Sequence, residues 1–444
     1  MTSIQIDLSK TRGPIKPMHA VNNGPAGSEV RGTSNLERFR DAGIPFARNH
    51  DASFYSGYGG EHTVDVHRIF KNFDADENDP NSYVFAPTDN YLASIEAAGC
   101  KTFYRLGASI EHDWKEGTYP PKDFLKWARI CEHIIRHYTE GWADGFTYDI
   151  PYWEIWNEPD CRNRDGSNPC WQGTDEQFIE LYSVAATHLK QCFPHLKIGG
   201  PAFCSAWPIP FKDAFLRHVK EHHIPLDFYS YHCYGRTPHD IYACIGAGEK
   251  ALEDAGLGGT MTILNEWNYI RGWFAEDWRY SLRMEKALKG ASFITGCMCA
   301  SQASSLGMLM YYDARPCGMN GMFDTDTLEP LKGYYPFPMF NTLYKLGTYA
   351  DCGWFEDGIH YCAATDGKDS AALLTYYVDD DAAEGKDVSV TFRGAAEGTR
   401  VTVSVLDAAH DNEIVSEEYF TAASFSKRLH FDLYTTYLIR VDAV

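Results

Sequence analysis

Short apolar runs alternate with amphipathic stretches between about residues 17 and 347 of this chain. Such alternation is typical of a parallel α/β architecture, in which each buried strand is followed by a helix that covers it. Eight runs have the length and composition of buried strands. They begin at Pro17, Ile44, Lys101, Tyr152, Leu196, Pro225, Met261 and Leu306.

The segments between these runs have helical spacing and helix-end signals. The segment TSNLERFRDAG offers Thr33 or Ser34 as its cap and ends at Gly43, and TDNYLASIEAAG ends at Gly99. The last such segment, FPMFNTLYKLG, ends at Gly347. Eight strand–helix units in sequence predict a closed (β/α)8 TIM barrel over residues 10–350.

After Gly353 the alternation of apolar runs and amphipathic helical stretches ends. Segments such as SAALLTYYV, KDVSVTFRG and TRVTVSVLDA are short, rich in β-branched residues and separated by Gly, Asp and Asn. This pattern predicts a C-terminal antiparallel β-sandwich over residues 351–444. The alternating N-terminal segment at residues 2–9 has no role in the barrel, so we expect it to join the sandwich.

Charge and composition narrow the range of partners. The formal charge is −21, and 44% of the residues are hydrophobic, enough for a large core. An acidic surface repels phosphate backbones, so we expect no nucleic-acid partner and favour a neutral substrate over a polyanionic one. No run approaches the roughly 18 apolar residues of a membrane span, so we expect no membrane association.

The N-terminus and the cysteines bear on the compartment. The start, MTSIQIDLSK, has no basic region followed by an apolar run, and the thirteen cysteines form no C-x-x-C pair. These features predict reduced thiols in a cytoplasm, with Cys161 and Cys170 as a pair only in an exported protein. The sequence leaves the oligomeric state open, with a homo-oligomer as one alternative.

The strongest chemical signal is YWEIWNEPD at residues 152–160. An apolar strand ends there in Asn157, Glu158 and Pro159, and proline cannot continue a strand ladder. Active sites of barrels are built at the C-terminal ends of the strands. Glu158 is therefore a candidate catalytic residue, and the alternative is a surface carboxylate after a buried strand.

A second carboxylate occupies a matching position. In TILNEWNY the seventh predicted strand ends in Glu266, which is followed by Trp267. Strands four and seven face each other across a barrel mouth, so Glu158 and Glu266 can act as a pair. Retaining glycosidases need two carboxyl groups about 5–5.5 Å apart, one to protonate the leaving oxygen and one to attack the anomeric carbon. Taken alone, Glu266 can also be read as a barrel-rim ion pair.

With these motifs the chain resembles the clan A glycoside hydrolases, and within them family 39, which contains β-xylosidases and α-L-iduronidases. The resemblance implies that Glu158 is the general acid/base, that Glu266 is the nucleophile and that Asn157 contacts the sugar 2-hydroxyl. The matching segments are FARNHD, RLG, WEIWNEP, IGGPA and DFYSYHCY, together with the β-sandwich.

The same resemblance implies further substrate-binding residues. Arg48 and His50 match residues that line the family's −1 subsite, and His232 and Tyr234 match an H-x-Y pair on the nucleophile side. Strand eight usually offers a tryptophan, whereas this chain has LMYYD, so Tyr311 is the candidate there and Tyr312 lies beside it. The nucleophile motif also departs from the family's T-E-Y/F-N, so neither xylosidase nor iduronidase activity follows automatically.

The sequence therefore predicts a retaining glycoside hydrolase that acts on short oligosaccharides or glycosides by double displacement. A β-xylosidase-like exo-enzyme is favoured, with α-L-arabinofuranosidase, β-glucosidase and β-galactosidase as rivals. A catalytically inactive sugar-binding relative, a transglycosylase and an inverting enzyme are the remaining alternatives. No metal and no organic cofactor are expected, since the chain lacks Walker and dinucleotide glycine motifs and pairs such as His218 and His222 lack a third ligand.

Overall fold

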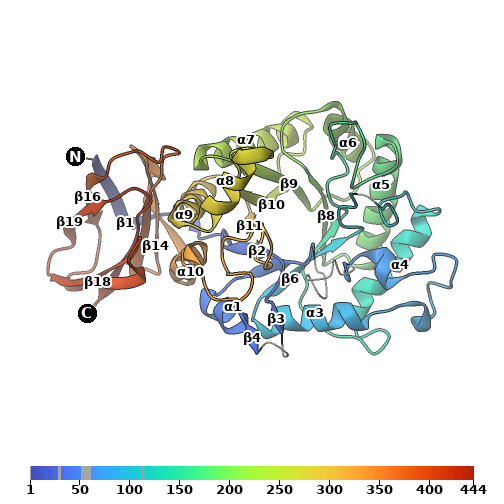
Figure 1. The fold of residues 1–444 in the computed structure, drawn as a ribbon, viewed down its shortest axis with the longest axis horizontal. Coiled ribbons are helices and arrows are strands. Elements are labelled where there is room, and N and C mark those ends of the chain that lie inside the picture. The colour runs from blue at the N-terminus through green and yellow to red at the C-terminus, as the bar shows by residue number, and fades with distance from the viewer. Residues whose placement is uncertain (1, 29–31, 52–61, 113) are drawn as a thin grey trace.

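A computed structural model describes residues 2–28, 32–51, 62–112 and 114–444. Eight parallel strands close into a barrel in the order β10–β11–β2–β5–β6–β7–β8–β9 (Figure 1). Each strand overlaps one of the eight apolar runs, so the predicted (β/α)8 barrel is confirmed. The strands are β2 (Ala20–Asn22), β5 (Phe46–Arg48), β6 (Lys101–Leu106), β7 (Tyr152–Ile155), β8 (Lys197–Phe203), β9 (Phe228–Gly235), β10 (Met261–Tyr269) and β11 (Met308–Tyr311).

Helices surround the barrel, and two of them end at the predicted glycines. Gly43 and Gly347 end their helices in the left-handed region, with φ of 60° and 83°. The helices are α1 (Leu36–Ala42), α2 (Val66–Ile69), α3 (Ala86–Ala97), α4 (Phe124–Thr139), α5 (Asp175–Cys192), α6 (Pro210–Glu221), α7 (Pro238–Asp254), α8 (Ala275–Glu285), α9 (Leu288–Ala303) and α10 (Pro336–Leu346). The short 3₁₀ turns are η2 (Pro80–Ser82) and η3 (Lys332–Tyr334).

The predicted cap of the first helix is wrong by one or two residues. Thr33 and Ser34 form β4 (Thr33–Ser34), which pairs with β3 (Gly27–Ser28), and Asn35 takes the N-cap position of α1. The Asn35 side chain accepts from the Ala26 backbone N–H at 2.7 Å instead of capping the helix. Pairing of the two short strands therefore decides where α1 begins.

The inside of the barrel is apolar at one end and polar at the other. Ala20, Phe103, Phe228, Ile263 and Met308 form a separate buried cluster at or near the N-terminal ends of their strands. The polar side chains of the barrel lie farther along the strands, toward the C-terminal ends. The polar side chains therefore lie at the end of the barrel where active sites are built.

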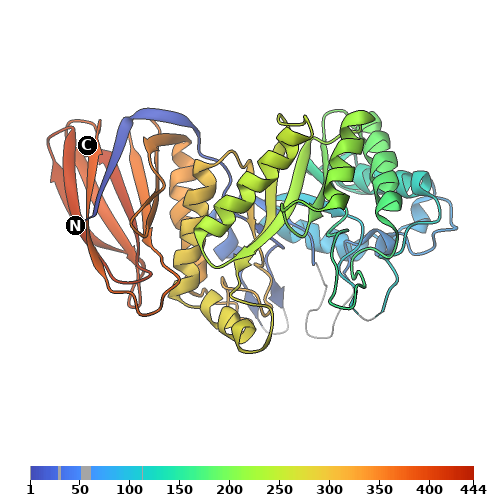
Figure 2. The same ribbon diagram turned by 90° about the horizontal axis from the view of Figure 1, so that it is seen from above.

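The C-terminal strands form a ten-stranded sheet that makes the sandwich beside the barrel (Figure 2). The strand β1 (Thr2–Pro14) lies within it, between β12 (Thr348–Cys352) and β16 (Lys386–Arg393). It runs antiparallel to β12 and parallel to β16, and Thr2 lies opposite Val388 of β16. Every other pairing in the sheet is antiparallel, so β1 is the exception to the predicted pattern. The other strands are β12 (Thr348–Cys352), β13 (Phe355–Glu356), β14 (Ile359–Thr365), β15 (Ser370–Tyr376), β16 (Lys386–Arg393), β17 (Thr399–Leu406), β18 (Asp411–Phe420), β19 (Ser424–Phe431) and β20 (Thr436–Ala443).

Helix α9 lies between the barrel strands and the sandwich and contacts both (Figure 1). Nearly all of its side chains are buried, as expected for a helix packed on both sides. On the sandwich side, Ser292 Oγ lies 2.7 Å from Thr375 Oγ1 and donates to the Tyr376 carbonyl. The barrel and the sandwich therefore share one helix as a common core element.

Ion pairs around the buried Lys289 and Asp379 reinforce this junction. Lys289 Nζ lies 2.7 Å from Asp379 and 2.9 Å from Asp381, and Arg236 lies 2.6 Å from the other oxygen of Asp379. Tyr269, the last residue of β10, also donates to Asp379 at 2.9 Å. The end of the strand that carries Glu266 is thus bound to the sandwich.

None of the helices in the described ranges has the length and apolar character needed to cross a bilayer.

Candidate active site

Glu158 follows β7 in a tight turn at the mouth of the barrel. Trp156 and Glu158 both have positive φ, 79° and 48°, which is uncommon for side chains of this size. Backbone hydrogen bonds hold the turn, from Trp156 N to Leu106 O at 2.8 Å and from Glu158 N to Ala202 O at 2.9 Å. The neighbouring strands β6 and β8 therefore fix the direction of the Glu158 side chain.

Glu266 lies inside β10, where the pairing with β9 shifts register between Leu264 and Glu266. In a regular strand, neighbouring side chains point to opposite faces, and a bulge re-aims them. Here both Asn265 and Glu266 reach inside the barrel, where Asn265 donates to Glu154 at 2.6 Å and Glu266 accepts from Arg48 at 2.8 Å. The bulge thus delivers two consecutive polar residues to one site.

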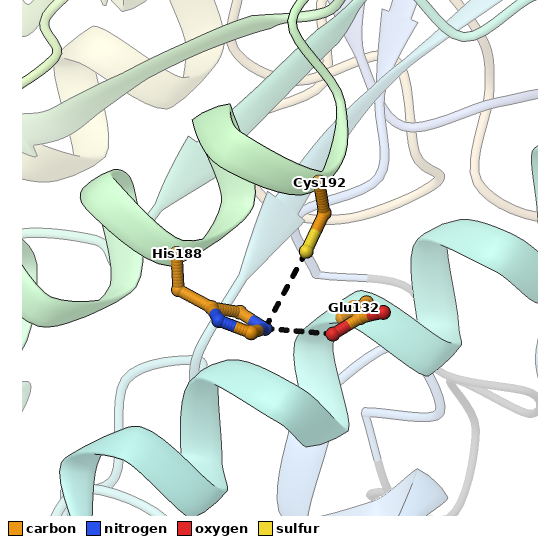
Figure 3. A group of neighbouring side chains, drawn as sticks. All are labelled: Glu132, His188 and Cys192. Atoms are coloured by element: carbon orange, nitrogen blue, oxygen red, sulfur yellow. Dashed lines mark hydrogen bonds and ion pairs between the residues drawn. The ribbon is translucent and has the colours of Figure 1, made fainter.

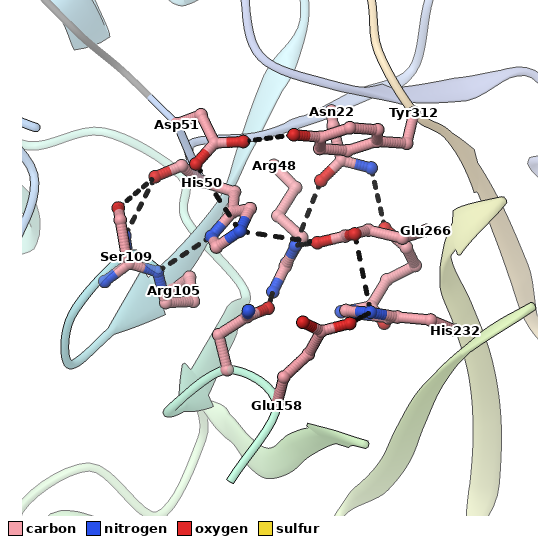
Figure 4. Close-up of polar contacts among 12 residues, drawn as sticks. Asn22, Arg48, His50, Asp51, Arg105, Ser109, Glu158, His232, Glu266 and Tyr312 are labelled. Atoms are coloured by element: carbon pink, nitrogen blue, oxygen red, sulfur yellow. Dashed lines mark hydrogen bonds and ion pairs between the residues drawn. The ribbon is translucent and has the colours of Figure 1, made fainter. Parts of the chain in front are cut away.

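The two carboxylates meet at the centre of the mouth (Figure 4). One oxygen of Glu158, one oxygen of Glu266 and a ring nitrogen of His232 all lie within 4.8 Å of one another. Both glutamates are shielded, with side-chain exposures of 17% for Glu158 and 6% for Glu266. This arrangement suits a reaction that needs an acid and a nucleophile close together.

Arg48, at the end of β5, connects the residues around Glu266. Its guanidinium is fully buried and donates to Glu154 at 2.7 Å, to Glu266 at 2.8 Å, to Asn157 at 2.7 Å and to Asn22 at 3.0 Å. A planar guanidinium can serve several acceptors in fixed directions, which an ammonium cannot do. Arg48 therefore orients both the candidate nucleophile and Asn157.

Glu154 is a site residue that the sequence interpretation missed. It lies in the middle of β7, fully buried, and accepts from Arg48, from Asn265 at 2.6 Å and from Ser230 at 2.5 Å. Its negative charge balances part of the Arg48 charge, so Arg48 is held by two carboxylates. The sequence feature that could have identified Glu154 is its charge, since it is the single charged residue of an otherwise apolar strand.

His50 belongs to a hydrogen-bonded chain that reaches Glu266 from the β5 side. Arg105 Nε donates to His50 Nδ1 at 3.2 Å, which leaves the ring proton on Nε2, 3.4 Å from Glu266 and 3.6 Å from Asp51. Burial holds the pKa of His50 well below its usual range, so the ring is neutral. Asp65 fixes Arg105 in turn through a 2.6 Å ion pair.

His232 and Tyr234 come from β9 and face the same way, two residues apart. His232 Nδ1 lies 2.7 Å from Glu158 and 3.4 Å from Glu266, and burial lowers its pKa. The Tyr234 hydroxyl donates to Glu266 at 2.9 Å. His232 therefore bridges the two carboxylates, while Tyr234 contacts the candidate nucleophile alone.

The structure does not bring Tyr311 to this group. Tyr311 is fully buried, and its hydroxyl accepts from Asn268 at 3.2 Å and from the Gly321 N–H at 3.1 Å, away from the two glutamates. The next residue, Tyr312, donates instead to Asp51 at 2.5 Å (Figure 4). Tyr312 is therefore the strand-eight aromatic that joins the polar network.

A tryptophan marks the rim of the site. The ring of Trp273 is 48% exposed and meets Tyr234 edge to face, with 5.0 Å between the ring centroids. It stacks on Trp278 at 5.5 Å, which holds the ring in place. An exposed flat ring beside Tyr234, which itself donates to Glu266, offers an apolar surface for stacking.

The two carboxyl groups differ in pKa because their surroundings differ. Burial raises the pKa of Glu158 to about 8, and the electrostatic effects of Cys161 and Asp160 act in the same direction. Burial also raises the pKa of Glu266 to about 7, reinforced by Glu158 and opposed by His232 and Arg48. Glu266 therefore loses its proton first and Glu158 keeps its proton longer, which separates a nucleophile from an acid.

Comparison with known proteins agrees with these motifs. Residues 47–256 match the model of glycosyl hydrolases family 39, so the family resemblance is confirmed. The chain is 30% identical over 184 residues to a β-xylosidase of Geobacillus stearothermophilus, an alignment covering 38% of this chain and 34% of that protein. The alignments with curated relatives span about a third of those proteins' length.

Solved structures match the whole chain. A glucosidase from Croceicoccus marinus aligns with a TM-score of 0.80 and 20% identity, covering 100% of this chain and 99% of that one. A monomeric β-xylosidase from Caulobacter crescentus aligns with a TM-score of 0.74 and 15% identity over 100% of both chains. At these identities the likeness shows the fold, a barrel with an attached β-sandwich.

Proposed function

We propose, on the premise that residues 47–256 form a family 39 segment, that this chain hydrolyses a glycosidic bond with net retention. The observation that carries the proposal is the pair of shielded carboxylates whose oxygens approach within 4.8 Å. Retaining enzymes have carboxyl groups about 5–5.5 Å apart, whereas inverting enzymes need about 6.5–9.5 Å to admit a water molecule. The spacing therefore favours double displacement.

In the first step, Glu158 donates its proton to the leaving oxygen while Glu266 attacks the anomeric carbon. Arg48 and Tyr234 each donate to one oxygen of Glu266, which keeps the carboxylate charged and aligned. In the second step, the ionised Glu158 takes a proton from water, and the water oxygen replaces Glu266 at the anomeric carbon. Asn157, held by Arg48, is positioned to contact the sugar.

The favoured substrates are short oligosaccharides or glycosides cleaved by a β-xylosidase-like exo-enzyme. Support comes from relatives named as β-xylosidases, with 30% and 28% identity over the aligned segments. α-L-Arabinofuranosidase, β-glucosidase and β-galactosidase activities are the rivals. A non-catalytic sugar-binding role is disfavoured because both carboxylates are present in complementary surroundings.

A panel of aryl glycosides tests the proposal, with wild type beside Glu266→Ala and Glu158→Ala. We expect one sugar to be cleaved, Glu266→Ala to be inactive, and azide to restore turnover with an inverted glycosyl azide as product. Exposed Glu140→Ala serves as the control and should keep wild-type activity. Full activity of Glu266→Ala on a sugar that wild type cleaves would overturn the mechanism. Added acceptor sugars separate hydrolysis from transglycosylation.

We also propose a cytoplasmic location. All thirteen cysteines are free, including several that lie close together. Free thiols persist in reducing compartments, whereas exported proteins tend to oxidise them. Cell fractionation with an antibody against the chain tests this, and recovery in the extracellular fraction would contradict it.

A further inference from the structure

Three cysteines lie around Glu158, two from the loop after β7 and one from the end of β8. Cys161 lies in the turn after β7, Cys170 lies farther along the same loop, and Cys204 follows β8. Cys170 Sγ lies 3.9 Å from a Glu158 oxygen. One oxygen of Glu158 and the sulfurs of Cys161 and Cys204 all lie within 4.8 Å of one another.

We propose that Cys161, Cys204 and Glu158 bind a zinc-class divalent ion. Thiolate sulfur selects borderline-soft ions such as Zn²⁺ or Cd²⁺ over Mg²⁺ and Ca²⁺. Around tetrahedral zinc, ligand atoms lie roughly 3.5–3.8 Å apart, as follows from the Zn–S and Zn–O bond lengths. Small side-chain rotations are enough to bring the three atoms to that spacing.

The backbone holds these ligands in place. Cys161 N donates to Glu158 O at 3.0 Å, and Cys204 N donates to the Asp160 side chain at 2.9 Å. Asp160 is fixed in turn by a 3.2 Å ion pair with Lys212, and both side chains are 3% exposed. The loop after β7 and the end of β8 are therefore connected, so binding requires little ordering of the chain.

The charges around the cluster also favour a cation. Lys212 is already neutralised by Asp160, and Arg162 turns toward Asp175 at 3.0 Å and toward backbone carbonyls. Cys161 and Cys204 are partly exposed, so an ion can enter from the mouth of the barrel. The metal replaces the thiol protons, which pass to solvent.

A rival cluster lies outside the barrel, between α4 and α5 (Figure 3). Glu132 and Cys192 approach the same nitrogen of His188, at 2.7 Å and 3.7 Å. Arg136 pairs with the same Glu132 at 2.9 Å. The adjacent Arg136 cation makes this cluster the poorer metal site, and Cys192 therefore provides the matched control.

The consequence for catalysis rests on the proposed function. An ion on Glu158 occupies the carboxyl group that must donate a proton, so Zn²⁺ should inhibit hydrolysis and a chelator should restore it. Metal binding is measured separately from hydrolysis. Failure to find a cleaved glycoside therefore leaves the metal site open to test, and the reverse holds as well.

The test uses the full-length, reduced protein and Co²⁺ as a spectroscopic probe, followed by displacement with Zn²⁺. Thiolate-to-cobalt charge transfer in the near ultraviolet should saturate at one ion per chain. Cys161→Ser and Cys204→Ser should each weaken binding at least 10-fold, while Cys192→Ser should bind like wild type. Circular dichroism verifies the fold of each variant. Unchanged binding in both Cys161→Ser and Cys204→Ser, or loss of binding in Cys192→Ser, would overturn the proposal.

Discussion

The buried guanidinium of Arg48 donates a 2.8 Å hydrogen bond to Glu266. The same side chain also donates to Glu154, Asn157 and Asn22. Arg48 therefore supplies the positive charge beside one oxygen of Glu266, while Tyr234 donates to the other.

Replacing Arg48 with lysine should lower kcat by about 100-fold, equivalent to about 2.7 kcal/mol of transition-state stabilisation. An ammonium keeps the charge but cannot reach all four acceptors at once. Steady-state kinetics on the best aryl glycoside measures the effect. Arg440→Lys, which retains an exposed 3.0 Å pair with Asp442, is the control. Equal kcat values for the two variants would contradict the role of Arg48.

The pH dependence of kcat/KM should be bell-shaped. Activity needs ionised Glu266 and protonated Glu158, whose pKa values are raised to about 7 and about 8. Activity should therefore fall below about pH 7 and above about pH 8. In Glu158→Gln, assayed with a leaving group that needs no protonation, the alkaline decline should disappear. An alkaline decline that persists unchanged would assign it to another group.

Tyr234→Phe should move the acidic side of the profile to higher pH. The Tyr234 hydroxyl donates to Glu266, which stabilises the ionised carboxylate. A typical hydrogen bond contributes about 0.5–1.5 kcal/mol, so the apparent pKa should rise by about 0.5–1 unit. Tyr242→Phe on the outer helix α7 is the control and should leave the profile unchanged. A shift toward lower pH would refute the predicted direction.

Glu158 should reduce stability as pH rises. Its pKa is raised from 4.5 to about 8 by folding, so the folded chain holds a proton that the unfolded chain releases. Stability should therefore fall between about pH 4.5 and 8, and Glu158→Gln should gain about 2–4 kcal/mol over wild type by pH 8. Urea unfolding at several pH values measures the difference. A gap that is constant with pH would rule out this linkage.

Asp379→Asn should weaken the junction between barrel and sandwich. It leaves Lys289, which is 3% exposed, without its 2.7 Å partner. Removing one member of a buried pair costs about 3–5 kcal/mol, and the remaining Asp381 should reduce the loss to about 2–3 kcal/mol. Urea unfolding measures this change as well. Asp432→Asn, at an 87% exposed side chain, should have little effect, and a similar loss there would contradict the explanation.

The barrel could be predicted from the sequence because each strand is a continuous apolar run followed by a helix with clear end signals. Glu158 and Glu266 could be found because they stand at or near strand ends. Glu154 could not, since its role depends on contacts from β5, β9 and β10. Tyr311 and Tyr312 are adjacent, and a strand pattern alone does not tell which of the two faces the site.

The position of β1 has a consequence for how the protein is made. Thr2 pairs with Val388, so β1 is made before the barrel but belongs to a sheet whose other strands are made after it. At about 5–20 residues per second, β1 waits roughly 20–80 s for β16. During that time the barrel can close while the N-terminal segment remains unpaired. The sandwich can therefore be completed only after β16, the parallel partner of β1, has been synthesised.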